Sequence, residues 1–215
     1  WRNISVYIPP SILQNYIPRK INILLAMDGE LGVVHALRGP GGFENAVINN
    51  IAPESILIGV PSMSDLLQFP DSNYNSGDQR SYSLIPFPCN PAIFPCSVVG
   101  FDPVNSGGAD QMLDFCQENV IPLVLELLRT KLQSDNSNTN IPNTDVFTKG
   151  EVSITGGSLG GLIAIYAAGT RPDEFARAWS LDGDVPINDG ELGRSIKTSY
   201  AASGKVPKYI TNQGG

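Results

Sequence analysis

The stretch 151–168, EVSITGGSLGGLIAIYAA, limits the fold of this chain more than any other part of it. Its first residues are apolar and partly β-branched, which predicts a strand, and the apolar series from Leu162 onward recurs at helical spacing. Between the two lies GGSLGG, whose glycines predict a tight turn. Strand, turn and helix around Gly156-x-Ser158-x-Gly160 predict a nucleophile elbow, in which a strained serine projects its hydroxyl above a sheet.

Two interpretations of this turn differ in their chemistry. Glycine-rich turns also occur where a helix simply packs closely on a strand, with no role for the serine. In an elbow the glycines are required, because a Cβ beside Ser158 would strike the adjacent strand or helix. Ser158 would also stand at a helix N-terminus, where the backbone N–H of Leu159 can point at a developing oxyanion. We favour the elbow because the flanking elements come in the right order.

Size and charge restrict the class of protein. The chain has 215 residues and a mass of 23.0 kDa, which predicts one domain over 1–215 with a substantial core. The net charge is −7 and the pI about 4.6, which argues against nucleic acid or an anionic membrane as a partner. No apolar run approaches the roughly 20 residues of a membrane span.

The first residue and the cysteines give information on the cellular compartment of the protein. The chain begins at Trp1 rather than Met, so we expect either a removed leader or a segment of a longer polypeptide. Cys89 and Cys96 bracket a short proline-containing loop that could hold a disulfide, whereas Cys116 falls in a helical pattern and is expected as a buried thiol. Asn3-Ile4-Ser5 is a glycosylation sequon. These features favour a secreted or exported protein, with a cytoplasmic one as the alternative.

The hydrophobic pattern predicts an α/β fold with a central, mostly parallel sheet and helices on both faces. Near-continuous apolar runs such as 21–27 and 55–60 are typical of strands covered on both sides. The predicted strands are 2–8, 21–27, 55–60, the run before the elbow, 175–181 and 206–210. The predicted helices are 43–51 after a glycine-rich turn at 39–42, 109–131 with a kink at Pro122, the elbow helix ending near Gly169, and 192–200. Residues 134–142 are predicted to form an exposed polar loop.

Residues 61–108 differ from the rest in composition, because they are rich in Pro, Ser, Asn and Gly. A loop of this length in a compact domain is usually functional or disordered. It follows the carboxyl end of a predicted central strand, so we interpret it as a wall of the binding cleft. A meandering surface insertion is the alternative.

An acyl-transfer serine needs a base, a group that orients the base, and donors for the oxyanion. The N–H of Leu159 is one predicted donor. The turn after strand 21–27 should lie beside the elbow in a parallel sheet, so the N–H of Glu30, or less favourably that of Gly29, is the predicted second donor.

The base is harder to assign. His35 is the only histidine, and it precedes the serine, whereas the order in α/β-hydrolases is serine, acid, histidine. His35 is therefore more typical of a surface residue, although it could line the cleft because it follows the predicted oxyanion turn. Asp182 follows a predicted strand and is a candidate acid, but a carboxylate in that position is more often a turn residue. The ligand spacing of a zinc site and the fingerprints of nucleotide-binding loops are missing from the sequence.

Several segments together resemble the putative-esterase family, which includes enterochelin, feruloyl and acetylxylan esterases, S-formylglutathione hydrolases and mycolyltransferases. The segments are YIPP (7–10), LLAMDGE (24–30), RSYSL (80–84), GGADQMLDFCQENVIPLV (107–124) and ITGGSLGGLIAIYAAGTRPDEFARAWSLDG (154–183). They span nearly the whole chain in the family's order.

The resemblance implies an α/β-hydrolase fold with a reduced lid, hydrolysis of carboxylic esters and no metal or organic cofactor. It places the nucleophile at Ser158 and the oxyanion donors at Leu159 and Glu30, and it puts Arg80 and Tyr82 near the cleft. In the family the acid and the histidine follow the strand that corresponds to 206–210, so both are expected beyond the end of this sequence. The C-terminal part of the fold is accordingly expected to be incomplete.

Two functional hypotheses follow. The first is a serine esterase that acts on a small-molecule or carbohydrate-linked ester through an acyl-enzyme at Ser158. The second is a non-catalytic binding or assembly module that uses the same fold and contacts other protein chains, since fold does not determine function. An intact elbow supports the first hypothesis. The absence of a histidine after Ser158 in this sequence, together with the acidic surface, supports the second.

Overall fold

The structure is a computed structural model that describes residues 3–14, 19–28, 39–62, 82–88, 90–92, 107–135, 147–183 and 187–213. A six-stranded sheet forms its centre, with strand order β1-β3-β2-β4-β5-β6. Only β1 runs antiparallel, on β3, and the other neighbouring pairs are parallel. The strands are β1 (Ser5–Tyr7), β2 (Arg19–Met27), β3 (Ser55–Val60), β4 (Phe147–Gly157), β5 (Arg177–Leu181) and β6 (Tyr209–Gln213).

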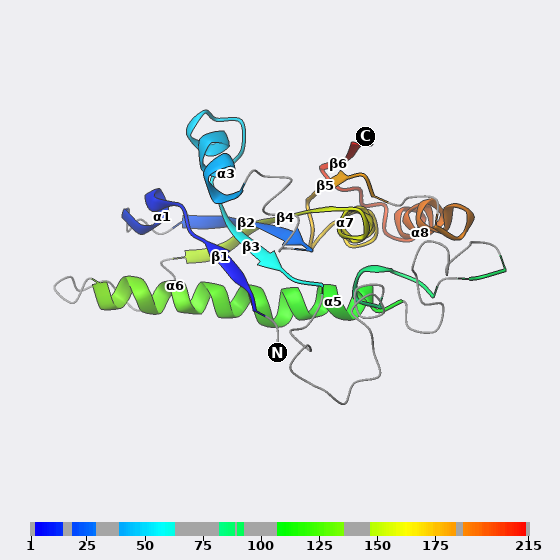
Figure 1. Cartoon of the computed structure of the whole chain (residues 1–215), viewed down its shortest axis with the longest axis horizontal. Coiled ribbons are helices and arrows are strands. Elements are labelled where there is room, and N and C mark those ends of the chain that lie inside the picture. Colours follow the sequence, from blue (N-terminus) through cyan, green and yellow to red (C-terminus); the bar gives the residue numbers. More distant parts are fainter. Residues whose placement is uncertain are drawn as a thin grey trace.

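Helices cover both faces of this sheet, as expected from the sequence (Figure 1). They are α1 (Pro10–Gln14), α3 (Gly39–Ile48), α5 (Ala109–Phe115), the π-helical turn η2 (Cys116–Val120), α6 (Ile121–Asp135), α7 (Leu159–Thr170) and α8 (Ile187–Ser203). In Figure 1 α3 lies above the sheet, and the green rod of α5, η2 and α6 runs along the opposite face. No helix among those described is both long and apolar enough to cross a lipid bilayer.

Alternation along β2 explains why helices are needed on both sides. Ile23, Leu25 and Met27 belong to the large core cluster shared with α5, α6 and α7. Ala26, between two of them, belongs to a smaller cluster with Phe43 of α3. A strand whose two faces are both apolar is stable only when each face is covered, which the parallel βαβ arrangement achieves.

The long helix predicted over 109–131 forms with its irregularity placed before the proline. Pro122 lacks an N–H, and its ring crowds the carbonyl four residues earlier, so the sequence predicts a kink there. Instead, η2 widens the turn that precedes Pro122, and the N–H of Ile121 bonds to the carbonyl of Cys116, five residues back. The wider turn accommodates the proline at the second position of α6. Cys116 is a buried thiol, as expected.

The boundaries of some elements differ from the predicted ones. The segment 39–42, predicted as a turn, is the first turn of α3, which ends at Ile48 rather than at 51. Glycine disfavours a helix by about 1 kcal/mol per residue, and here the packing of Phe43 against the sheet outweighs that preference. β5 and β6 start later than predicted, at Arg177 and Tyr209, and α8 extends from Ile187 to Ser203.

Arg171 joins the C-terminal end of α7 to α5. Its guanidinium lies 2.6 Å from a carboxylate oxygen of Asp114 on α5 and 2.6 Å from one of Glu174. One turn earlier on α7, the Tyr166 hydroxyl donates to the carboxylate of Asp110 at 3.1 Å. Burial, with the nearby Asp110 carboxylate, raises the pKa of Tyr166 to about 12. These contacts fix α7 against α5 and so set the direction in which α7 leaves the sheet.

Candidate active site

The backbone at Ser158 makes a strained turn from strand to helix, which is the backbone geometry that the sequence predicted, and this turn is called the elbow below. Ser158 stands between β4 and α7 with φ 52° and ψ −121°, a region that side-chain-bearing residues rarely adopt. A serine that caps a helix normally has β-region angles and accepts a hydrogen bond from the first turn. Ser158 makes no such side-chain cap, and the residue is exposed. The side chain of Ser158 therefore does not cap its own helix, unlike that of a serine in an ordinary capped turn.

Two of the four neighbouring glycines are required by the close approach of backbone atoms, and a third faces a buried side chain. A Cβ on Gly156 would lie 2.5 Å from the carbonyl carbon of Gly160, and a Cβ on Gly160 would lie 2.9 Å from the carbonyl oxygen of Met27. A Cβ on Gly161 would lie 2.4 Å from the Ser180 hydroxyl. These approaches bring α7 directly onto the ends of β2 and β5, so the hydroxyl of Ser158 is held at the carboxyl edge of the sheet.

Backbone hydrogen bonds lock the elbow in place. The N–H of Ser158 donates to the carbonyl of Leu181 at the end of β5, at 2.9 Å. The carbonyl of Ser158 accepts from Gly161 and Leu162, at 2.9 and 3.0 Å, which closes the first turn of α7. The first N–H groups of a helix have no partner within it, and Leu159 is the first residue of α7. Its N–H therefore belongs to the set that can bind an anion beside Ser158.

The end of β2 forms the other side of this edge. The backbone turns at Asp28, whose φ is 58° and whose side chain is buried. The hydroxyl of Ser62, just after β3, donates to the Asp28 carboxylate. A Cβ on Gly160 would lie 3.3 Å from Cβ of Asp28, so this turn packs on the first turn of α7. The prediction that the turn after strand 21–27 lies beside the elbow is confirmed for Asp28.

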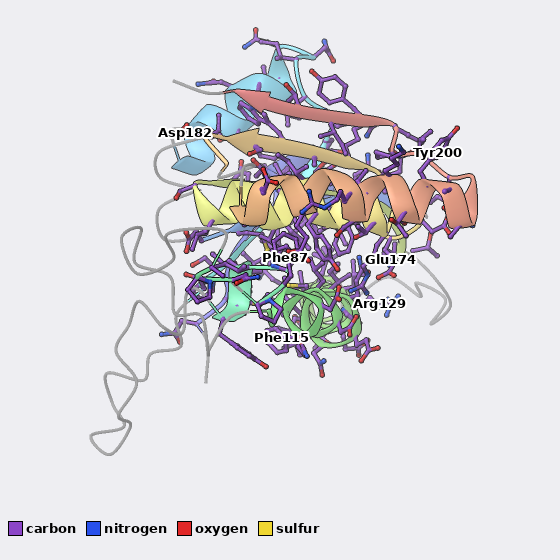
Figure 2. All side chains as sticks on the ribbon, turned by 90° about the vertical axis from the view of Figure 1, so that its right-hand side faces the viewer. Phe87, Phe115, Arg129, Glu174, Asp182 and Tyr200 are labelled. Carbon is purple, nitrogen blue, oxygen red and sulfur yellow. The ribbon has the colours of Figure 1, made fainter. Side chains whose placement is uncertain are left out.

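The other candidate site residues divide into placed and undescribed ones. Asp182 is exposed, has φ 52° and directly follows the carbonyl that accepts the N–H of Ser158, at the tip of β5 (Figure 2). Tyr82 is 46% exposed, and its ring lies against Gly108, whose N–H donates to the Tyr82 carbonyl at 2.8 Å. The following residues lie outside the described part of the chain: Gly29, Glu30, His35, Arg80, Cys89 and Cys96.

The segment 82–88 shows how part of the predicted cleft loop is held. Beyond the Gly108 bond, the N–H of Ala109 donates to the carbonyl of Ile85 at 3.3 Å. Ser83 to Phe87 are buried, so this piece of the 61–108 region docks on the N-terminal end of α5. Whether the whole region forms a cleft wall stays a prediction, because most of it lies outside the described residues.

Sequence reasoning missed three residues at this edge. It assigned Asp28 only to a turn, and it gave no role to Ser62 or Ser180. Ser180 pairs with Gly156 across β4 and β5, and its buried hydroxyl has no hydrogen-bond partner among the described residues. Ser62 and Asp28 are 34 positions apart, so only the strand order brings them together. For Asp28 and Ser62 the available signal was a polar residue following the end of a buried strand, whereas Ser180 lies within β5 and gave no such signal.

Metal ligands are a separate question. The described residues contain no group of three or more His, Cys, Asp or Glu side chains placed to hold a metal ion.

Comparison with known proteins gives a family and a fold. Residues 102–208 match the model of the family described as "Putative esterase". No curated protein matches the chain.

Solved structures are similar over the whole chain. Siderophore hydrolase EstA from Aspergillus nidulans is 21% identical with a TM-score of 0.63, and the match covers 100% of this chain and 67% of that one. The BES protein from Bacillus cereus is 14% identical with a TM-score of 0.64, covering 100% and 72%. An IroE-like serine hydrolase from Shewanella oneidensis is 15% identical with a TM-score of 0.59, covering 100% and 69%. At these identities the likeness shows the fold, which is that of α/β-hydrolase-like esterases.

Proposed function

We propose that the chain, whose residues 102–208 match the family described as "Putative esterase", is a serine esterase that hydrolyses a carboxylic ester through an acyl-enzyme at Ser158. The observation that carries this proposal is the conformation of Ser158. A positive φ at a serine that does not cap its helix costs about 1–3 kcal/mol, and such strain persists where the surrounding structure and function require it. Here the strain presents an exposed hydroxyl at the ends of the parallel strands.

The proposed reaction has two steps. Oγ of Ser158 attacks the carbonyl carbon, its proton passes to a base, and the alcohol leaves to give an acyl-serine; water then releases the acid by the same route. Negative charge develops on the carbonyl oxygen in each step. We assign the N–H of Leu159 and that of Glu30 as the donors for this oxygen, and a donor of this kind typically lowers the barrier by about 3 kcal/mol.

We assign no general base from the described residues: the sequence has a single histidine, His35, and it is not among them. Asp182 is placed at the same edge as Ser158, and we keep it as a cleft candidate. Activity is therefore measured on the native polypeptide that carries this chain, where the base is present if the proposal is right.

Labelling of Ser158 tests the proposal directly. We expect a fluorophosphonate to form one adduct, located at Ser158 by peptide mapping, and Ser158→Ala to abolish it. Ser203→Ala is the matched control, because it removes an exposed serine hydroxyl at the far end of α8. A native polypeptide that takes no label, or takes it equally in Ser158→Ala, would refute the proposal and favour a binding or assembly module.

The substrate class is then approached with a panel of esters. We propose a small-molecule or carbohydrate-linked ester, and the panel contains short nitrophenyl esters, feruloyl sugars, thioesters and a siderophore ester, the last because one structural neighbour is a siderophore hydrolase. Hydrolysis that requires Ser158 identifies the class, and failure of every ester despite labelling would mean that the substrate lies outside the panel or that the acyl group passes to an acceptor other than water.

A further inference from the structure

Asp28 is a buried acid at the position where β2 ends. It is 6% exposed and has φ 58°. Asn adopts this backbone region as readily as Asp does, so the turn itself does not call for a carboxylate. Burying a carboxylate costs free energy unless donors compensate it. The backbone conformation at residue 28 therefore does not explain why a carboxylate is buried there.

The contacts of Asp28 connect three elements at the carboxyl edge of the sheet. Its carboxylate accepts a hydrogen bond from the hydroxyl of Ser62, which is 3% exposed and follows β3. A Cβ on Gly160, in the first turn of α7, would lie only 3.3 Å from the Cβ of Asp28. Asp28 itself directly follows Met27, the last residue of β2. One side chain thus spans the end of β3, the end of β2 and the helix that begins at Ser158.

We propose that Asp28, held by Ser62, is a positioning residue that fixes the end of β2 against the first turn of α7, so that the backbone N–H of Leu159 faces the oxyanion formed at Ser158. The inference rests on the proposed function. A hydrogen bond to a charged acceptor is stronger and more directional than a neutral one, which suits a contact that must hold a turn against a helix. A displaced donor weakens binding of the transition state more than that of the ester, because charge on the oxygen develops only there.

The test compares an ester with its thionoester, in which sulfur replaces the acyl carbonyl oxygen. Sulfur accepts hydrogen bonds weakly, so well-placed donors stabilise the transition state of the ester more than that of the thionoester. A general loss of folded protein lowers both rates equally and leaves their ratio unchanged. The ratio of the two kcat values therefore reports donor placement and is insensitive to stability.

The variants are Ser62→Ala and Asp28→Asn, made in the native polypeptide. Ser62→Ala removes the hydrogen bond, and we expect kcat for the ester and the ester-to-thionoester ratio each to fall about tenfold, with KM nearly unchanged. Asp28→Asn keeps an acceptor oxygen but removes its charge, so an intermediate fall is expected. Asp28→Asn also tests the proposal by itself if Ser62→Ala does not fold.

Ser55→Ala is the matched control. Ser55 begins β3, the strand that Ser62 follows, is 4% exposed, and donates to the carbonyl of Pro53 at 3.0 Å. Its loss should lower stability to a similar degree and leave the ratio unchanged. The inference is wrong if both Ser62→Ala and Asp28→Asn keep the wild-type ratio within twofold. A wild-type protein that is neither labelled nor active refutes the proposed function instead.

Discussion

Gly156→Ala and Gly157→Ala make the same chemical change at adjacent positions, and the structure predicts opposite results. A Cβ on Gly156 would lie 2.5 Å from the carbonyl carbon and 2.6 Å from the carbonyl oxygen of Gly160. A Cβ on Gly157 would meet only the carbonyl oxygen of Leu181, at the ordinary contact distance of 3.7 Å. Neither glycine has a positive φ, so alanine is free of backbone strain at both.

The magnitude follows from how far the backbone must move. Ordinary contact begins at 3.4 Å, so alanine at 156 requires α7 to retreat from β4 by about 0.9 Å. Overpacking of this kind costs about 1–3 kcal/mol, and the clash is with backbone rather than with an adaptable side chain. Alanine also restricts the unfolded chain, which stabilises by about 0.4–1 kcal/mol where no clash occurs. We expect Gly156→Ala to lose about 2 kcal/mol and Gly157→Ala to gain about 0.5 kcal/mol.

Urea unfolding of the two variants measures this difference. With a dependence of about 2 kcal/mol per molar urea, the two midpoints should differ by about 1 M. Fluorophosphonate labelling is the second measurement, because a retreat of α7 also moves Ser158: Gly157→Ala should keep the wild-type labelling rate and Gly156→Ala should slow it. Equal midpoints and equal labelling rates would refute the inference that contact between Gly156 and Gly160 sets the position of the elbow.

Three further predictions concern the support of the site. Ser180→Ala should leave stability unchanged or raise it by up to about 1 kcal/mol in urea unfolding, because it removes a buried hydroxyl that has no partner among the described residues. Arg171→Met should lower the free energy of unfolding by about 1 kcal/mol, because it deletes the ion pairs with Asp114 and Glu174 on a side chain that is only 19% exposed. The loss should be smaller at high salt, which screens these ion pairs in the wild type. Burial and the Asp110 carboxylate raise the pKa of Tyr166 to about 12 in the folded protein, from its ordinary value of 10.0. The contribution of Tyr166 to the free energy of unfolding is fully present below pH 10. It is lost as the pH rises toward 12, because the tyrosine ionises at a lower pH in the unfolded chain than in the folded protein. Tyr166→Phe should flatten that decline when unfolding is measured across this range.

Local patterns predicted the elbow because its causes are local. The β-branched run of β4, the glycines and the apolar start of α7 are consecutive in sequence, and each constrains the backbone of its neighbours. The parallel sheet followed for a similar reason, since runs that are apolar on both faces require helices on both sides. Asp182 could be placed at the sheet edge because it directly follows a strand.

Interactions between distant segments could not be predicted in this way. The contact of Asp28 with Ser62 depends on β2 and β3 being neighbours in register, with Met27 opposite Val60. The start of α3 at Gly39 reflects packing of Phe43 that outweighs glycine's helix preference. The π-helical turn before Pro122 is likewise a response to crowding, which the residue pattern alone does not reveal.

Replacement of Ser158 by glycine separates the strain of the elbow from its chemistry. At φ 52° and ψ −121° glycine is unstrained, so Ser158→Gly should recover part of the 1–3 kcal/mol that the serine costs there. Glycine loses more entropy on folding, by roughly 0.5–1 kcal/mol, which leaves a net gain of about 1 kcal/mol. Ser158→Ala is the control, because it lacks the hydroxyl but keeps the strain, and its stability should stay near that of the wild type. Both variants should lose the fluorophosphonate adduct. If Ser158→Gly is no more stable than Ser158→Ala, the backbone at 158 is not strained, and its conformation no longer supports a catalytic role for Ser158.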